Sequence, residues 1–303
     1  MKNRPPSPVT GSGDTAKVLT IPTKDILSAY RAEDLGEIEP YFTKIKQVDV
    51  YECLDTGYRF YYPFGIFGDD KFYEYLQRKR PHYSHLRWEH QPALNLIDKK
   101  KKVLEVGSGS GDFLERTTKL AKEARGLEFN AKAIRASKKK GLDVIGESIQ
   151  KHAKKNPAYY DVVCMFQVLE HISDVRPFLD ASVRALKSGG KLIIGVPNNN
   201  PYLFRHDVLH ALNLPPHHSG LWNRRALSAL AGEFGLTVDS VTIEPLQEPD
   251  YYWYVQQKYR KEHSPILYWL FRPLSIGWLR RPRNHILRTY RDGRNALAIY
   301  TKQ

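Results

Sequence analysis

Cysteine and long apolar runs are scarce in this 303-residue chain. Cys53 and Cys164 are its only cysteines, which excludes a disulfide framework and a four-cysteine zinc site. Residues 1–14 contain no apolar run, so we expect neither a signal peptide nor an anchor there, but a disordered tail over residues 1–20 of a cytoplasmic protein. An apolar, aromatic segment at residues 265–279 is interrupted by Arg272 and Pro273 and is shorter than the ~20 residues that span a bilayer.

Acidic residues are outnumbered by basic ones, and the formal net charge is +14. Such an excess favours an anionic partner or simply solubility. Residues 258–294 hold ten Lys or Arg against Glu262 and Asp292, a surplus of eight charges in one segment. A basic aromatic segment can make peripheral contact with an anionic inner membrane surface, or form a substrate lid or a homodimer face. The sequence leaves these three alternatives open.

Short apolar strands alternate with amphipathic helices from Lys102 onward. This alternation predicts an α/β fold with a parallel sheet that is covered by helices on both faces. The predicted strands are residues 103–106, 125–129, 142–146, 160–167, 191–198, 236–245 and 295–302. The predicted helices are residues 111–121, 130–140, 148–155, 174–190, which would end at Gly189-Gly190, and 223–235. Before this region, a hairpin is predicted over residues 48–63, with Gly57 in its turn.

The most informative stretch is residues 103–113, VLEVGSGSGDF. A strand that runs into a glycine turn and a helix start places backbone amides against a nucleotide-like ligand. A dinucleotide fingerprint requires G-x-G-x-x-G, whereas this turn reads G-x-G-x-G with Asp112 in place of the last glycine. Glu128 ends the next strand 17 residues after Gly111, near the ~20-residue offset at which a carboxylate meets ribose hydroxyls.

These features resemble motif I and the second-strand acid of the class I S-adenosyl-L-methionine (SAM) methyltransferases. The sequences VLEH (168–171) and PPHH (215–218) also resemble a bacterial group that acts on small molecules and glycans. The resemblance runs from about residue 48 to 244. It implies SAM as cofactor and a Rossmann-like, mostly parallel seven-stranded sheet whose last strand is antiparallel, with an N-terminal cap and a helical insertion before the final strand.

The resemblance also implies a division of the chain and a set of cofactor contacts. The expected parts are a tail (1–20), an N-terminal cap or substrate region (21–97), a SAM-binding core (98–245), the basic insertion (246–294) and a final core strand (295–303). The expected cofactor-binding residues are Glu105, Gly107, Ser108, Gly109, Gly111, Phe113, Glu128, Phe129, Ser148, Ile149, Gln167 and Val168.

Three histidines are the candidate catalytic residues. His171 follows the fourth strand of the core, and ligands of open parallel sheets bind outside the carboxyl ends of the strands. His217 and His218 are adjacent, so in extended chain they cannot both face the core. With an ordinary pKa of about 6.5, a histidine can act as a base toward a substrate hydroxyl. The alternative is that these side chains have a purely structural role and only cap a helix or a loop.

Four further residues are candidates for the substrate side: Tyr83, Trp88, Glu89 and Trp222. Related enzymes often carry a zinc knuckle of the form C-x-x-C-G near the hairpin. Here Thr56 stands in place of its second cysteine, so no metal is predicted.

The sequence therefore predicts an enzyme, a SAM-dependent methyltransferase acting on a small-molecule or glycan-type hydroxyl. An RNA or protein methyltransferase is the first alternative, favoured by the net charge but lacking a recognisable RNA-binding module, so nucleic acid is not the expected partner. An NAD-dependent oxidoreductase is disfavoured by Asp112, and a non-catalytic SAM-binding protein by the intact motifs. Two copies of an N-P-x-Y-like pattern, at 156–160 and 198–202, lie away from the end of the fourth strand, which argues against nucleobase chemistry.

Overall fold

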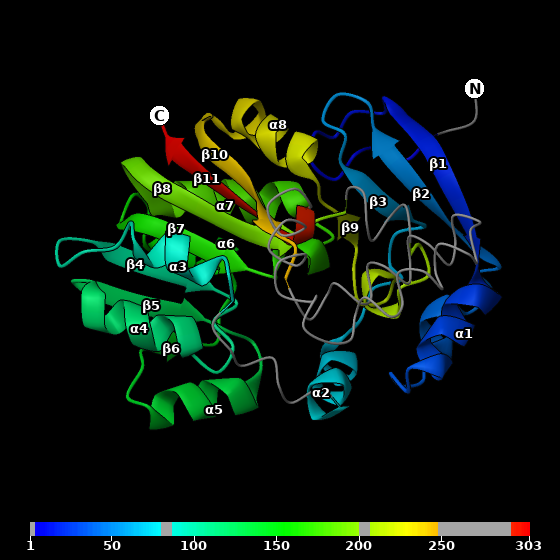
Figure 1. Cartoon of the computed structure of the whole chain (residues 1–303), viewed down its shortest axis with the longest axis horizontal. Helices are drawn as coiled ribbons and strands as arrows, with labels where there is room; N and C mark the ends of the chain where they lie inside the picture. Colours follow the sequence, from blue (N-terminus) through cyan, green and yellow to red (C-terminus); the bar gives the residue numbers. More distant parts are fainter. Residues whose placement is uncertain (1–3, 80–86, 200–206, 248–291) are drawn as a thin grey trace, which may run out of the picture.

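The computed structural model describes residues 4–79, 87–199, 207–247 and 292–303, which form two sheets with their helices (Figure 1). The basic segment over residues 258–291, and with it most of the predicted insertion, lies outside the described residues. None of the helices in the described parts has the length and hydropathy of a membrane span.

The larger sheet has seven strands in the order β10-β11-β8-β7-β4-β5-β6. The strands from β8 to β6 are parallel neighbours, whereas β11 is antiparallel to both β10 and β8. This confirms the predicted Rossmann-like methyltransferase sheet with an antiparallel last strand. The strands are β4 (Lys102–Val106), β5 (Glu123–Leu127), β6 (Val144–Ile145), β7 (Tyr160–Phe166), β8 (Leu186–Pro197), β10 (Leu236–Pro245) and β11 (Asp292–Lys302).

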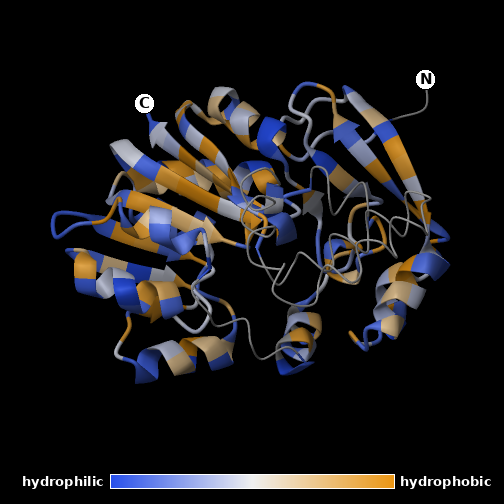
Figure 2. Ribbon diagram, in the orientation of Figure 1, coloured by the Kyte–Doolittle hydropathy of each residue, from blue (hydrophilic) through white to orange (hydrophobic). Residues whose placement is uncertain are grey.

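Helices cover this sheet on both faces, and the side chains of β7 pack against both layers of helices. Alternate residues of a strand point to opposite faces. Val163 and Met165 join one buried cluster with residues of α6, α7 and α8, whereas Val162 and Cys164 join another with residues of α3 and α4. The covering helices are α3 (His90–Leu94), α4 (Asp112–Leu120), α5 (Ala131–Lys139), α6 (Ile149–Lys155), α7 (Val175–Ala185) and α8 (Arg224–Phe234). Figure 2 shows apolar strands between helices whose outer sides are polar.

The smaller sheet has four antiparallel strands in the order β1-β2-β3-β9. They are β1 (Thr15–Pro22), β2 (Gln47–Cys53), β3 (Arg59–Tyr62) and β9 (Gly220–Leu221), with the helices α1 (Thr23–Ala32) and α2 (Asp70–Lys79) and the short turns η1 (Glu39–Phe42) and η4 (Ala211–Asn213). β2 and β3 form the predicted hairpin, in which Gly57 has φ +72°. β9 follows the PPHH sequence. The last strand of the smaller sheet therefore comes after most strands of the larger sheet in the chain.

Two sequence predictions are wrong. Residues 4–20 are not a disordered tail, because β1 pairs with β2 and Val9 is fully buried. Pairing with β2, rather than the local composition of the segment, makes residues 15–22 a strand. The helix predicted to continue to Gly190 ends at Ala185, and Leu186 already pairs with Tyr160 as the start of β8. Gly189, predicted as part of the helix stop, lies within that strand with φ +73°.

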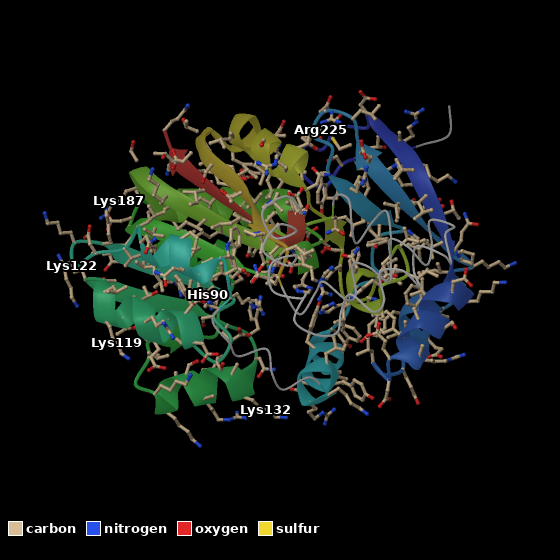
Figure 3. The ribbon with its side chains drawn as sticks, viewed as in Figure 1. His90, Lys119, Lys122, Lys132, Lys187 and Arg225 are labelled. Atoms are coloured by element: carbon tan, nitrogen blue, oxygen red, sulfur yellow. The ribbon has the colours of Figure 1, made fainter. Side chains whose placement is uncertain are left out.

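Some surface basic residues of the core lie away from the smaller sheet, whereas Arg225 of α8 lies beside it and donates to Leu54 O at 2.6 Å (Figure 3). Lys119, Lys122 and Lys187 project from the outer side of the larger sheet in Figure 3. They are helix-end and strand-end residues in solvent, and 73% of the Lys119 side chain is exposed.

Candidate functional site

The glycine turn between β4 and α4 is tightly packed at two of its glycines and open at the third. A Cβ on Gly107 would lie 2.4 Å from Val168 Cγ2, and one on Gly111 would lie 2.4 Å from Leu142 Cδ1. A Cβ on Gly109 would meet nothing within 4 Å. All three have positive φ, which disfavours other residues. A ligand can therefore approach the backbone at Gly109, between two glycines that the packing requires.

Glu128 is held beside this turn by three backbone amides. Its Oε2 accepts a hydrogen bond from Gly109 N at 2.8 Å, and its Oε1 accepts from Phe129 N and Asn130 N, each at 2.8 Å. A carboxylate has about four acceptor positions, so these bonds orient it and leave capacity for a further donor.

Glu105 lies inside the sheet with an unsatisfied carboxyl oxygen. Its side chain is buried, and neither Glu105 Oε2 nor the buried Ser108 Oγ has a hydrogen-bond partner among the described residues. Burial, followed by the charges of Glu128 and Asp112, raises the pKa of Glu105 well above its usual value. Buried polar atoms without partners are costly and rare. A donor-bearing or cationic ligand would satisfy these two.

Gln167 is the centre of a polar network at the carboxyl end of β7. Its φ is +56°, and its amide donates to Glu89 Oε1 at 3.1 Å and to Asn295 Oδ1 at 3.3 Å. Asn295 in turn donates to Glu244 Oε2 at 2.7 Å. The Glu89 side chain is fully buried, and its burial raises its pKa. No local sequence signal pointed to Asn295 and Glu244, because only the order of the strands in the sheet brings them to Gln167.

Other predicted residues occupy less direct positions. Phe113 packs between His90 and Phe166 in the core, Ile149 is buried under the sheet, and Ser148 caps α6 by accepting from Lys151 N. Phe129 is 69% exposed next to Glu128. Trp88 packs against the cluster that contains Phe113, and Tyr83 lies outside the described residues.

Trp222 is a correction to the predicted substrate contacts. Its side chain is fully buried, and its ring centroid is 4.3 Å from that of Tyr58. It packs in the main core cluster with residues of α8, and its Nε1 has no hydrogen-bond partner among the described residues. A tryptophan next to a polar loop motif suggests a site residue, but burial of the large apolar surface of this side chain stabilises the core.

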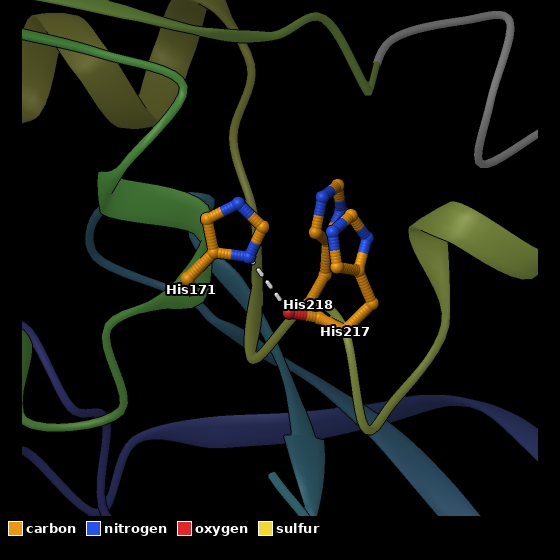
Figure 4. A group of neighbouring side chains, drawn as sticks. All are labelled: His171, His217 and His218. Carbon is orange, nitrogen blue, oxygen red and sulfur yellow. Dashed lines mark hydrogen bonds between the residues drawn. The ribbon is translucent and has the colours of Figure 1, made fainter. Parts of the chain in front are cut away.

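The three predicted histidines converge (Figure 4). His171 ends the short turn η2 (Leu169–His171) after β7, while His217 and His218 precede β9. One ring nitrogen from each lies within 4.8 Å of the others. His171 Nδ1 lies 2.7 Å from the His217 carbonyl oxygen, His217 Nδ1 lies 2.7 Å from Leu212 O, and His218 Nδ1 lies 3.1 Å from Asn213 Oδ1. We call these three side chains the histidine cluster.

Burial keeps two members of the histidine cluster, His171 and His218, neutral. It lowers the pKa of His171 to about 4, and burial together with the other two rings lowers the pKa of His218 well below its usual value. Glu170 adjoins the cluster, with Oε1 3.8 Å from His171 Nε2. Its side chain is buried, its Oε2 has no partner among the described residues, and burial raises its pKa to about 8.

Tyr73 of α2 supports the cluster, and no sequence signal pointed to it. Its hydroxyl donates to the His217 carbonyl oxygen at 3.0 Å and lies 3.3 Å from His171 Nδ1. Burial raises its pKa, so the hydroxyl remains a donor at neutral pH.

The glycine turn and the histidine cluster are neighbours through Val168. The Val168 side chain packs where a Cβ of Gly107 would be, and its carbonyl oxygen accepts from His171 N at 3.0 Å. The carboxyl ends of β4 and β7 thus bring together a ligand-binding turn and three convergent imidazoles.

Comparison with known proteins identifies this arrangement. A sequence family described as "Methyltransferase domain" matches residues 76–241, more than half of the chain. The chain belongs to this methyltransferase family. Its larger sheet has the class I fold of the S-adenosylmethionine-dependent methyltransferases, whose cofactor is SAM. The oxidoreductase alternative is thereby set aside.

Individual relatives are similar over part of their length. The chain is 33% identical over 106 residues to a ubiquinone biosynthesis O-methyltransferase of Klebsiella pneumoniae, which is 33% of this chain and 44% of that protein. It is 29% identical over 117 residues to the enzyme of the same name from Pectobacterium carotovorum, or 49% of that protein. The chain thus spans less than half the length of these curated relatives. A SAM-dependent methyltransferase from Archaeoglobus fulgidus has the same fold, with a TM-score of 0.52 at 18% identity, over 77% of this chain and all of that chain.

The polar residues of the methyltransferase site fit this cofactor. SAM carries an ammonium and a sulfonium, and the unsatisfied Glu105 Oε2 and Ser108 Oγ lie at the turn that would face it. Gly109 leaves the backbone open there, and Glu128 is oriented at the strand end where ribose hydroxyls are expected.

Proposed function

We propose that this methyltransferase transfers the methyl group of SAM to a hydroxyl oxygen of a small-molecule or glycan-type acceptor. The convergence of His171, His217 and His218 next to the glycine turn is the observation that supports an acceptor site there. The names of the similar proteins, O-methyltransferases of ubiquinone biosynthesis, support an oxygen acceptor.

Within this proposal, Gly109, Glu105 and Glu128 hold the cofactor. Glu128 binds the ribose hydroxyls, and Glu105 with Ser108 faces the cationic end, while Gln167 and Val168 line the side toward the acceptor. When bound, SAM supplies an electrophilic methyl group that an oxygen lone pair attacks as the carbon–sulfur bond breaks. Placing the two reactants in line contributes about 7–11 kcal/mol to lowering the barrier.

The histidine cluster then accepts the proton of the acceptor hydroxyl or promotes its loss to solvent. A general base contributes about 10²- to 10⁴-fold in rate. His171 is neutral and can accept a proton, but its pKa of about 4 makes it a weak base. It would therefore act only as the carbon–oxygen bond forms and the hydroxyl becomes more acidic.

A screen with labelled SAM tests the proposal. Hydroxyl-bearing metabolites, phenols and sugar nucleotides form one arm, and RNA and protein acceptors form the other. We expect label in an ether product of the first arm. Label that appears only in RNA or protein would contradict the proposal and favour the first alternative.

Two predictions about partners concern residues 258–294. Peripheral contact with an anionic inner membrane surface, by a protein otherwise in the cytoplasm, predicts flotation with anionic but not neutral liposomes. A homodimer through the same segment predicts a doubled mass in solution that is lost when the segment is deleted.

A further inference from the structure

We propose that the histidine cluster is a binding site for a divalent transition-metal ion, best matched by Zn²⁺. The ligands would be the Nε2 atoms of His171, His217 and His218. The metal site itself follows from the arrangement of the residues, whereas the chemical role of the ion rests on the proposed function. The site is distinct from the zinc knuckle that Thr56 rules out.

The hydrogen bonds of the three rings set their tautomers. Each Nδ1 lies 2.7–3.1 Å from a carbonyl-type oxygen, those of His217, Leu212 and Asn213, which can only accept a hydrogen bond. Each Nδ1 therefore carries the proton, and the lone pair is on Nε2. The orientation of the Asn213 amide is set by its own donation from Nδ2 to Asn199 Oδ1 at 2.8 Å. Metal-binding histidines characteristically make this second hydrogen bond.

The spacing is close to that of a bound ion. Zinc–nitrogen bonds of about 2.0–2.1 Å place tetrahedral ligands about 3.4 Å apart. One ring nitrogen of each residue already lies within 4.8 Å of the others, so side-chain rotations that bring the farthest pair up to about 1.4 Å closer reach this spacing. The ring centroids of His171 and His217 are 4.6 Å apart, and those of His171 and His218 are 4.9 Å apart.

The charges around the cluster suit a cation. Imidazoles must be neutral to bind a metal, and burial already keeps His171 and His218 neutral. The buried Glu170 carboxyl, 3.8 Å from His171 Nε2 and with one oxygen unpartnered among the described residues, would supply a compensating negative charge when it loses its proton on cation binding. Three protein ligands leave one tetrahedral position open, as in catalytic rather than structural zinc sites.

An open position next to the glycine turn has a use in hydroxyl methylation. A hydroxyl that binds a Lewis acid there loses its proton to solvent more readily, which replaces the base role of the imidazoles, whose Nε2 lone pairs would bind the ion. The metal would also join η2 of the larger sheet's edge to the loop that leads into the smaller sheet.

The test uses full-length protein stripped with a chelator and then titrated with Zn²⁺ and with Co²⁺ as a spectroscopic probe. We expect one ion per chain and the visible absorption of tetrahedral Co²⁺. His171→Gln and His217→Gln should each weaken Zn²⁺ binding by more than the ~10–100-fold loss seen when a second-shell partner is removed. His210→Gln, in the same segment but outside the cluster, is the matched control and should bind as wild type. Calorimetric SAM binding shows that each variant is folded.

The absence of stoichiometric binding to the wild-type protein, or equal Zn²⁺ affinity in all four proteins, would overturn the proposed site. Full methylation of a hydroxyl acceptor by chelated protein would overturn the activating role of the ion and leave the proposed function intact. Failure of the proposed function would show differently, as metal binding without methylation of any hydroxyl acceptor.

Discussion

His171 Nδ1 lies 2.7 Å from the carbonyl oxygen of His217, a residue 46 positions later in the chain. This contact joins the carboxyl end of β7 to the segment that leads into β9. It orients one imidazole of the histidine cluster and brings the larger sheet's ligand edge against the smaller sheet. The proposed acceptor chemistry depends on this junction.

Glu128→Gln should weaken SAM binding while the fold is retained. The substitution removes the charge that faces the ribose and disturbs three amide hydrogen bonds. Hydrogen bonds to charged groups contribute about 1.5–3 kcal/mol, so we expect SAM affinity to fall about 10- to 150-fold. Calorimetry measures it, with Asp143→Asn of the surface pair with Arg125 as control. Unchanged affinity would contradict the role of Glu128.

Gly107→Ala and Gly109→Ala should separate packing from ligand binding. Both residues have positive φ, which costs alanine about 1–2 kcal/mol. Only Gly107→Ala also brings a Cβ to 2.4 Å from Val168, so it should lower the free energy of unfolding further. Gly109→Ala should lose SAM affinity at a smaller cost in stability. Denaturant unfolding and calorimetry test this pair, and the reverse ranking of stabilities would be inconsistent with the packing seen here.

Glu170 should make the metal-free protein less stable as pH rises. Its pKa is raised from 4.5 to about 8, so the folded state holds a proton that the unfolded state has lost between these values. Relative to a Gln variant, the free energy of unfolding is greatest below pH 4.5. It declines by at most ~1.4 kcal/mol per pH unit as the pH rises to about 8. Glu170→Gln should therefore flatten the dependence of unfolding free energy on pH. A profile with the same slope in wild type and variant would show that Glu170 does not titrate in this way.

Trp222→Ala should act on stability and not on substrate recognition. Removing a fully buried tryptophan costs about 3–5 kcal/mol. Trp222→Phe, which keeps most of the packing with Tyr58, should restore much of this loss and leave the Michaelis constant for the acceptor unchanged. Thermal melting and steady-state kinetics distinguish the outcomes, and a raised acceptor constant in Trp222→Phe would restore its predicted substrate role.

The parallel core was predictable because its signals are local. The glycine turn and Glu128 lie within one βαβ unit, the strand–helix alternation is visible segment by segment, and the antiparallel last strand follows from the family resemblance. β1 was missed because its pairing partner, rather than its own composition, makes it a strand. The start of β8 at Leu186 was missed because tertiary pairing with Tyr160 overrides the helical pattern before it.

The site was predictable as separate residues but not as an arrangement. His171 and His217–His218 were identified individually, each with an ordinary structural alternative. Nothing in a linear sequence states that a loop 46 residues later returns to the same strand end, or that Tyr73 and Leu212 O orient the rings. The same limit explains Trp222, whose place beside a polar motif concealed its complete burial.

The most direct measurement is single-turnover methyl transfer to a hydroxyl acceptor, with SAM saturating, by wild type and His171→Gln. The SAM affinity of both proteins is measured on the same preparations. We expect equal SAM affinity and a rate lower by at least ~10²-fold in His171→Gln, because the cluster acts on the acceptor and not on the cofactor. Equal rates in the two proteins would contradict the claim that the histidine cluster activates the acceptor.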